Sequence, residues 1–407
     1  MRVISLTAPG RNGIYECHRK LLSQLAERGC SLNWLCSGRQ HFDRIIEECS
    51  ETSNGEVVAP DTDNLAARTR AIVEKIHERS PDVVLCHALG DPLELNTIRY
   101  LSNSIPKILI VHSNTLASYR AARAVRDCVS ATIAISPRIK LDLISHYGFR
   151  EERVHVIPNG FDASVYSSRV RIPSPAGRLR ILSHGRIDRS KGLFWIPEML
   201  SRLARHSDKW DCTISGDGPD IAELKRRFAL VGLCDRVKFI GWVLSKDVPE
   251  LMNQHDVLLF PSKYEGFGTA LIEAMAGGCV PVASRLPGIT DWIIEDGVDG
   301  LLFPIGDVRR AVQHLAGLLS DRLRLAELRQ RAQQAVGRFN LSLMAVEYYR
   351  LLCDIKSLPG NIPASERMDH FNLAEGLRPA WWYRIPEPIK DYLRLVREQV
   401  RVFVSIP

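Results

Sequence analysis

The stretch PSKYEGFGTALIEAMAGGCVPVAS, residues 261–284, displays the pattern on which the whole chain is built. An apolar run ends just before it at Phe260, a glycine-rich loop follows, and a segment of good helix formers begins near Thr269. A second short β-rich run, Val280–Ala283, comes after the helical segment. A strand, a loop, a helix and another strand make a βαβ unit, and such units build parallel sheets.

Short β-rich runs alternate with helical periodicity over most of the remaining sequence. In the first half the expected strands are Arg2–Leu6, Ser31–Cys36, Val83–His87, Lys107–His112, Ala131–Ile135 and Val154–Ile157. In the second half they are Leu179–His184, Trp210–Ser215, Val237–Ile240, Val257–Phe260 and Val280–Ala283, and the best helices are Lys191–Arg205, Pro219–Leu230, Thr269–Ala276 and Arg309–Leu319. This alternation predicts an α/β protein with two doubly wound, Rossmann-like domains facing a central cleft.

The length of the chain also indicates two domains, because a single hydrophobic core stops growing at roughly 250–300 residues and this chain has 407. The alternation is interrupted at SRVRIPSPAGR, residues 168–178, whose prolines and glycine are typical of a linker. The predicted domains are therefore residues 1–167 and 179–340. A closing helix is expected at 341–355, followed by an extension at 356–407.

Charge and composition narrow the class of protein. The net charge of +7 favours an anionic partner, but there is no basic tail or recognised module for nucleic acid, so no nucleic-acid partner is expected. The ten cysteines are scattered without a C-x-x-C pair, which favours a reducing, cytoplasmic compartment and gives no support to a zinc site. No run approaches the ~18 apolar residues of a membrane span, so membrane contact would be peripheral, at the inner face.

The loop and helix of residues 261–284 have the chemistry of a phosphate and sugar site. A glycine-rich loop that opens a helix leaves backbone N–H groups free, and the helix dipole adds partial positive charge, which suits a phosphate. Glu265 and Glu273 flank the loop, and an ionised carboxylate only accepts hydrogen bonds, as sugar hydroxyls require. A loop-capped helix without function is the alternative for this segment alone.

The stretch SHGRIDRSKGL, residues 183–193, adds two cations at a second strand-to-helix loop. Arg186 and Lys191 lie on a loop at the start of an expected helix. Their positive charges and the helix N-terminus could together bind a diphosphate. The competing interpretation is a solvated basic loop.

Two further segments contain a turn or loop directly after an expected strand. ISGDGPDIAEL, residues 214–224, contains a glycine turn with Gly216 and Gly218 before a proline that opens a helix. FIGWV, residues 239–243, ends at Val243 after a strand. A binding role through backbone groups and a purely structural role remain equally open for both.

The motif E-G-F-G-x-x-x-x-E-A-M-A, with Glu265 and Glu273 as its E-x7-E pair, resembles the signature of glycosyltransferase family 4, whose retaining enzymes have the GT-B fold. The resemblance implies that Glu265 contacts the transferred sugar and that Glu273 binds the ribose hydroxyls. The G-R-x(4)-K-G spacing of Arg186 and Lys191 matches the family's diphosphate-binding pair. The remaining donor-binding residues implied by the resemblance in this domain are Gly216, Gly218, Val243, Gly266, Phe267, Gly268 and Thr269.

The first half of the chain resembles the same family less closely. The loop PGRNG, residues 9–13, is similar to the family's first glycine loop, and Gly13 is its best candidate for touching the donor phosphates. It lacks the usual adjacent glycines. His112 ends a strand where the family has a histidine near the donor sugar, so it joins Arg186, Lys191 and Glu265 as a catalytic candidate. His87 also ends a strand, and a structural role is favoured for it.

The resemblance runs from about residue 3 to 355 and implies a hexosyltransferase. Such an enzyme would move a sugar from a UDP- or GDP-sugar to a hydroxyl of a glycan, glycolipid or lipid-linked acceptor, in bacterial polysaccharide or cell-envelope biosynthesis. It would need no cofactor and no metal, since Asp61-x-Asp63 lies outside every donor motif. A GT-B nucleotide-sugar epimerase, a phosphorylase and a non-catalytic nucleotide-sugar-binding subunit are the competing hypotheses.

The extension 356–407 carries no recognised motif. Trp381, Trp382 and Tyr383 precede a helical run from about Glu387. Apolar residues line one face of this helix and charged residues the other: Ile389, Tyr392, Leu393, Val396, Val400 and Phe403 against Lys390, Asp391, Arg394, Arg397, Glu398 and Arg401. The helix could lie on an anionic membrane, but packing on the protein or on a second subunit is favoured because acidic residues share the polar face.

Overall fold

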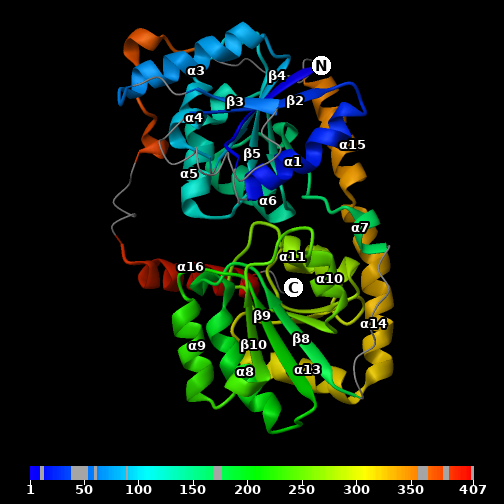
Figure 1. The fold of residues 1–407 in the computed structure, drawn as a ribbon. Helices are drawn as coiled ribbons and strands as arrows, with labels where there is room; N and C mark the ends of the chain where they lie inside the picture. Colours follow the sequence, from blue (N-terminus) through cyan, green and yellow to red (C-terminus); the bar gives the residue numbers. More distant parts are fainter. Residues whose placement is uncertain are drawn as a thin grey trace. The chain divides into compact units, whose positions relative to one another are not determined.

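A computed structural model describes residues 1–9, 13–37, 54–58, 62–88, 90–167, 177–355, 365–378 and 385–404. It contains two compact units, Met1–Gly160 with Leu341–Arg384 and Phe161–Asn340 with Ile385–Pro407. Each unit has one parallel sheet with helices packed around it, as Figure 1 shows. The predicted α/β class is confirmed.

The first unit is built on a sheet with the strand order β3-β2-β1-β4-β5-β6-β7. Its strands are β1 Arg2–Leu6, β2 Ser31–Ser37, β3 Gly55–Val58, β4 Val83–His87, β5 Lys107–Val111, β6 Ala131–Ala134 and β7 Val154–Val156. Its helices are α1 Gly13–Ala26, α3 Leu65–Arg79, α4 Pro92–Thr97, α5 Leu116–Val125, α6 Pro137–Tyr147 and α15 Leu341–Asp354. The inner strands β4 and β5 are buried along their whole length, as parallel strands covered on both faces must be.

The second unit repeats this plan with the strand order β10-β9-β8-β11-β12-β13. Its strands are β8 Leu179–His184, β9 Trp210–Ser215, β10 Val237–Gly241, β11 Val257–Phe260, β12 Val280–Ser284 and β13 Leu301–Phe303. Its helices are α7 Ala163–Ser167, α8 Ile196–Ala204, α9 Ile221–Leu230, α10 Val248–Asn253, α11 Thr269–Ala276, α12 Thr290–Ile293, α13 Val308–Ser320, α14 Arg322–Ala335 and α16 Glu387–Val404. Trp210, Phe228 and Phe303 are among the largest side chains of its core.

The structure corrects two details of the sequence prediction. The helix expected at Lys191–Arg205 begins only at Ile196, after two short 3₁₀ turns, because Gly192 between them has a left-handed φ of 63°. The edge strands β3 and β13 were not predicted, since runs of four and three residues give too little periodicity to detect. The other predicted strands agree with the structure to within one residue at each end.

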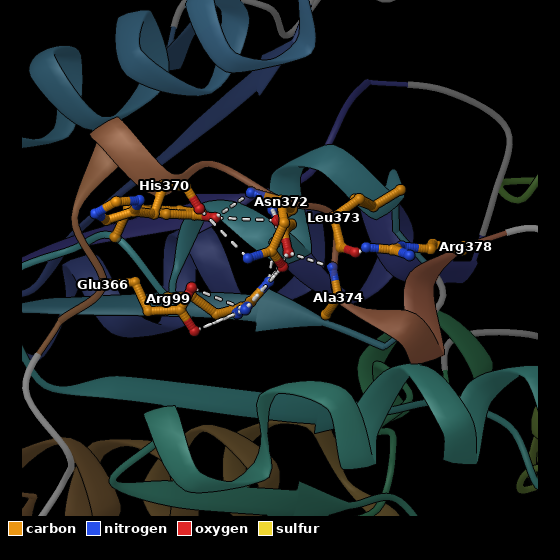
Figure 2. A network of polar contacts seen from close by, with 9 residues as sticks. Arg99, Glu366, His370, Asn372, Leu373, Ala374 and Arg378 are labelled. Atoms are coloured by element: carbon orange, nitrogen blue, oxygen red, sulfur yellow. Dashed lines mark hydrogen bonds and ion pairs between the residues drawn. The ribbon is translucent and has the colours of Figure 1, made fainter.

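Residues 365–378 of the C-terminal extension are fixed to the first unit by Arg99 (Figure 2). Its guanidinium pairs with Glu366 at 2.6 Å from Nη2 to Oε1 and donates to the carbonyl of Asn372 at 3.1 Å. The backbone N–H of Ala374 also donates to the side chain of Asn96 at 3.1 Å. The chain is therefore held here by polar contacts at three successive points.

Helix α16, in red in Figure 1, belongs to the second unit. Leu395 packs against the buried cluster of Leu286, Ile289 and Ile305. The charged residues Lys390 and Glu398 are 5% and 0% exposed, whereas four apolar residues of the helix are not covered: Ile389 is 51% exposed, Tyr392 65%, Leu393 45% and Val396 37%. The predicted amphipathic helix is thus present and turns charged side chains inward.

Four predicted features of the chain lie wholly or partly outside the described residues. They are the loop at 9–13, the linker at 168–178, the aromatic run at 381–383 and the side chains of the C-terminal helix at Asp391, Arg397, Val400, Arg401 and Phe403. Within the described ranges, no helix is long and apolar enough to cross a bilayer.

Candidate functional site

Four neighbouring strands of the second sheet end in the loops that carry the predicted donor residues. These strands, in the order β10, β9, β8 and β11, are all parallel, so their carboxyl ends lie along one edge. Val243 follows β10, Gly216 and Gly218 follow β9, Arg186 and Lys191 follow β8, and Glu265 follows β11. In a doubly wound sheet this edge is where ligands bind.

Lys191 and Glu265, two predicted site residues, are in direct contact. The Lys191 Nζ lies 2.7 Å from the Glu265 Oε1, and the side chains are 28% and 10% exposed. The hydroxyl of Ser262 donates to the same oxygen at 2.8 Å. The two loops are also joined through their backbones, because the N–H of Lys263 donates to the carbonyl of Ser190 at 2.9 Å. A cation and a carboxylate are thereby fixed side by side.

Asp188 organises the loop that carries Arg186 and Lys191. Its carboxylate accepts the Ser190 N–H at 2.8 Å and the Arg186 Nε at 2.5 Å. Burial by itself raises the pKa of Asp188, but hydrogen bonds from Ser190 and Arg186 and the charge of Lys191 outweigh it, so the pKa is lowered. Arg186 is 71% exposed and remains accessible to an anion. Asp188 and Ser262 were not predicted, although D-x-S before a helix is a recognisable turn signal.

The loops at this edge touch through their backbones. A Cβ on Gly192 would lie 2.0 Å from the carbonyl oxygen of Pro261, and one on Gly216 would lie 1.9 Å from that of Gly185. Both glycines have positive φ angles, 63° and 125°. Gly218 is equally confined, because a Cβ added there would lie 2.2 Å from the carbonyl oxygen of Ile187. These predicted residues act through close backbone packing.

Helix α11 begins at the predicted phosphate-binding loop. Gly268 is its N-cap residue with φ 108°, and no side chain among the described residues caps it. Phe267 is 2% exposed and packs edge-on against Phe339 at 5.5 Å, which anchors the loop between Gly266 and Thr269. Glu273 is half-buried one turn further along the helix. The arrangement offers backbone N–H groups and a helix dipole to an anion.

Val243 is half-buried at the outer end of this row of loops. Its neighbours Trp242 and Leu244 are 53% and 50% exposed, which is high for large apolar side chains. They follow the edge strand β10 directly. This outer loop is the part of the site with most freedom for side-chain variation.

The first unit carries the remaining predicted residues at the carboxyl ends of its own strands. Gly13 is the first residue of α1, and His112 directly follows β5. His87 Nδ1 lies 2.9 Å from His112 Nε2, and its Nε2 lies 3.0 Å from the hydroxyl of Ser5. The structure thus joins His87, for which a structural role was favoured, to the candidate catalytic histidine.

Burial keeps this histidine pair neutral. It lowers the pKa of His112 to about 4. Burial also lowers the pKa of His87 well below its ordinary value, with the neighbouring His112 and His18 adding to the effect. Only one of the two facing nitrogens can carry the shared proton, so the tautomer of one ring sets that of the other.

The part of the chain that the structure describes contains no group of three or more His, Cys, Asp and Glu side chains that could hold a metal ion. Asp63 is described, but Asp61 of the Asp-x-Asp sequence is not.

Both halves of the chain match known protein families. Residues 12–165 match the family described as Glycosyltransferase Family 4, and residues 167–336 match the family described as Glycosyl transferases group 1. The second match includes Arg186, Lys191, Glu265 and Glu273. The two matches correspond to the two sheets.

Two curated relatives show the range of similar proteins. The lipopolysaccharide core biosynthesis glycosyltransferase LpsE of Rhizobium meliloti is 29% identical over 231 residues, 56% of this chain and 64% of that protein. The alpha-D-kanosaminyltransferase of Streptomyces kanamyceticus is 27% identical over 258 residues, 61% of this chain and 65% of that protein. The chain therefore spans less than two thirds of the length of these relatives.

The fold is shared with solved structures. The crystal structure of HepE of Anabaena in complex with UDP has a TM-score of 0.73 and covers 87% of this chain and 100% of its own, at 22% identity. The predicted GT-B architecture, with two Rossmann-like domains, is thereby confirmed.

Proposed function

We propose that this chain, which has the two domains of a GT-B glycosyltransferase of the family 4 type, moves a hexose-type sugar from a nucleotide-diphosphate sugar to a hydroxyl group. The observation that carries the proposal is the Lys191–Glu265 ion pair at the carboxyl edge of the second sheet. It lies within the segment matched by Glycosyl transferases group 1. It joins the two kinds of group that a sugar diphosphate requires, a cation and a hydrogen-bond acceptor.

The donor would lie along the row of loops. Arg186, Lys191 and the N-terminus of α11 would meet the diphosphate, and Glu265 would accept hydrogen bonds from the transferred sugar. Glu273 would bind the ribose hydroxyls. The wall beside the nucleotide would be formed by the closely packed backbone at Gly216 and Gly218 and by the loop at Val243.

Transfer would pass through a state with positive charge on the sugar and growing negative charge on the departing diphosphate. Arg186 and Lys191 would stabilise that diphosphate. By resemblance to family 4, the acceptor hydroxyl would attack from the face that the diphosphate leaves, with retention of configuration and no side-chain nucleophile. By the same resemblance His112, held neutral by burial, would contact the donor sugar as a hydrogen-bonding group.

A UDP-sugar is the first donor to test, with a GDP-sugar second. HepE, which shares the fold, was crystallised with UDP and with UDP-glucose. For the acceptor we propose a glycan, glycolipid or lipid-linked sugar of bacterial polysaccharide or envelope synthesis. LpsE, whose name assigns it to lipopolysaccharide core biosynthesis, supports that choice.

A peripheral contact with an anionic membrane at its cytoplasmic face is part of the proposal. The uncovered apolar residues of α16, Ile389, Tyr392, Leu393 and Val396, would enter the lipid surface. The net charge of +7 would favour anionic lipid. Sedimentation with vesicles that contain phosphatidylglycerol should carry the chain down, and variants with Leu393→Ser and Val396→Ser should stay in solution. A wild-type chain that stays in solution would rule out the proposed membrane contact.

The donor proposal is tested by thermal denaturation with UDP, GDP, ADP and their sugars. A matching nucleotide at 100 times its Kd should add about 2.7 kcal/mol of stability. Incubation of the matching nucleotide-sugar with lipid-linked or glycan acceptors should then yield a glycosylated product. An epimerised nucleotide-sugar without transfer would favour the epimerase hypothesis, and binding without turnover would favour a non-catalytic subunit.

A further inference from the structure

Helix α16 reaches the donor loop through Arg394. The guanidinium Nη1 of Arg394 donates to the hydroxyl of Tyr264 at 2.8 Å, and its Cζ lies 5.2 Å from the centre of the Tyr264 ring. Tyr264 directly precedes Glu265 in the chain. A residue of the C-terminal extension therefore contacts the neighbour of the carboxylate that pairs with Lys191.

The next residue of α16, Leu395, is anchored in the core of the same unit. Leu395 and Trp195 both pack against the buried cluster of Leu286, Ile289 and Ile305. The Nζ of Lys263 lies 5.5 Å from the centre of the Trp195 ring. Trp195 ends the pair of 3₁₀ turns that contains Lys191 and Gly192. Arg394 thus contacts the loop that holds Glu265, and Leu395 packs against the same cluster as Trp195, which follows Lys191 by four residues.

We propose that Arg394 is a positioning residue of the donor site, which holds the loop at residues 261–268 so that Glu265 faces the transferred sugar. The sugar as the ligand of this loop rests on the proposed function. The contact between Arg394 and the loop does not depend on that function. A hydrogen bond from a charged donor to a half-buried hydroxyl is among the stronger protein hydrogen bonds. A loop displacement of about 1 Å can lower the rate of an enzyme a hundredfold. Because Tyr264 directly precedes Glu265, holding Tyr264 in place also fixes the position of the Glu265 carboxylate.

The inference predicts different effects on sugar and nucleotide binding. Glu265 is assigned to the sugar, whereas the diphosphate is assigned mainly to other groups. Loss of the Arg394 contact should therefore weaken UDP-glucose or GDP-mannose binding about tenfold, the usual effect of a lost charge-assisted hydrogen bond, with much less effect on UDP or GDP. A general loss of stability would weaken all four probes alike.

The experiment compares Arg394→Met, Arg394→Lys and Tyr264→Phe with the wild-type full-length chain. Gln399→Ala is the matched control, because Gln399 is exposed and lies on the same helix. Hydrogen–deuterium exchange of the peptide covering 261–268 is measured without ligand, and calorimetry gives the four affinities. We expect faster exchange of this peptide and selective loss of sugar-nucleotide binding in Arg394→Met, partial rescue in Arg394→Lys, and wild-type behaviour in Gln399→Ala.

Three results would overturn the inference. Unchanged exchange of the loop in Arg394→Met would show that the contact does not hold it. Faster exchange with unchanged affinity for UDP-glucose and GDP-mannose would show that Arg394 only attaches the extension. A wild-type chain that binds none of the four probes would overturn the proposed function, and the donor role of Arg394 with it, and the exchange data would distinguish this case from the other two.

Discussion

Lys191 and Glu265 are 74 positions apart in the chain, and the Lys191 Nζ lies 2.7 Å from the Glu265 Oε1. They come from the loops after β8 and β11, which are neighbours in the sheet. The ion pair fixes both side chains, which the proposed function assigns to different parts of a sugar diphosphate.

Lys191→Ala and Glu265→Ala should each lower kcat/KM at least ~100-fold, because each removes a preorganised charge that acts in the transition state. The measurement is steady-state transfer with the donor found by thermal denaturation. Arg202→Ala is the control, since Arg202 forms an ion pair with Glu198 on α8 whose side chains are 47% and 51% exposed. Near-normal turnover in Lys191→Ala or Glu265→Ala would remove that residue from the site.

EDTA should change the transfer rate less than about twofold, because Arg186 and Lys191 are proposed to supply the positive charge that a metal supplies elsewhere. The assay is run with chelated and untreated enzyme, followed by manganese or magnesium. Activity that disappears with EDTA and returns with manganese would contradict this prediction.

Gly192→Ala should destabilise the protein by at least about 2 kcal/mol, because a left-handed φ and a Cβ within 2.0 Å of a carbonyl oxygen combine there. Gly317, inside α13, offers the opposite case, since nothing lies within 4 Å of a Cβ at that position. Gly317→Ala should stabilise by about 0.5–1 kcal/mol. Urea unfolding of both variants checks the contrast, and equal effects would show that the loop tolerates a side chain.

Glu94 should make stability fall as the pH rises. Burial raises its pKa to about 8, and the charge of Asp91 adds to this, although the Ser37 N–H at 2.8 Å opposes it. Because the folded pKa exceeds the unfolded one, the contribution is complete below about pH 4.3 and is lost as the pH rises through about 8. Between pH 5 and pH 9 the free energy of unfolding of Glu94→Gln should therefore rise by roughly 2–4 kcal/mol relative to that of the wild type. Urea unfolding measures this difference. A constant difference between the two proteins would rule out this titration.

Arg99→Ala should release residues 365–378 from the first unit. The Arg99 side chain is 10% exposed and binds both Glu366 and Asn372, so its loss should cost about 2 kcal/mol locally. Cleavage after Glu366 and Glu375 by a glutamate-specific protease should become at least ~10-fold faster. Arg367→Ala is the control, because that side chain is 79% exposed. Unchanged cleavage in Arg99→Ala would place the anchor elsewhere.

The sequence predicts the fold well because inner parallel strands are continuous apolar runs. Leu179–His184 and Val257–Phe260 agree with the structure at both ends. The sequence does not predict which distant residues come into contact, because this depends on strand order and on where the C-terminal helix packs. His87 with His112 and Arg394 with Tyr264, 130 positions apart, are such contacts. The periodicity of α16 likewise identifies a helix without indicating that Lys390 and Glu398 are covered.

The close backbone packing at Gly192, Gly216 and Gly218 sets a rule for directed evolution of this chain. Libraries meant to change the donor nucleotide should leave these three codons fixed, since any side chain there meets a carbonyl oxygen. Diversity belongs at Trp242 and Leu244, whose exposed side chains border the same row of loops. A new specificity would then arise at the rim of the site while its backbone scaffold stays intact.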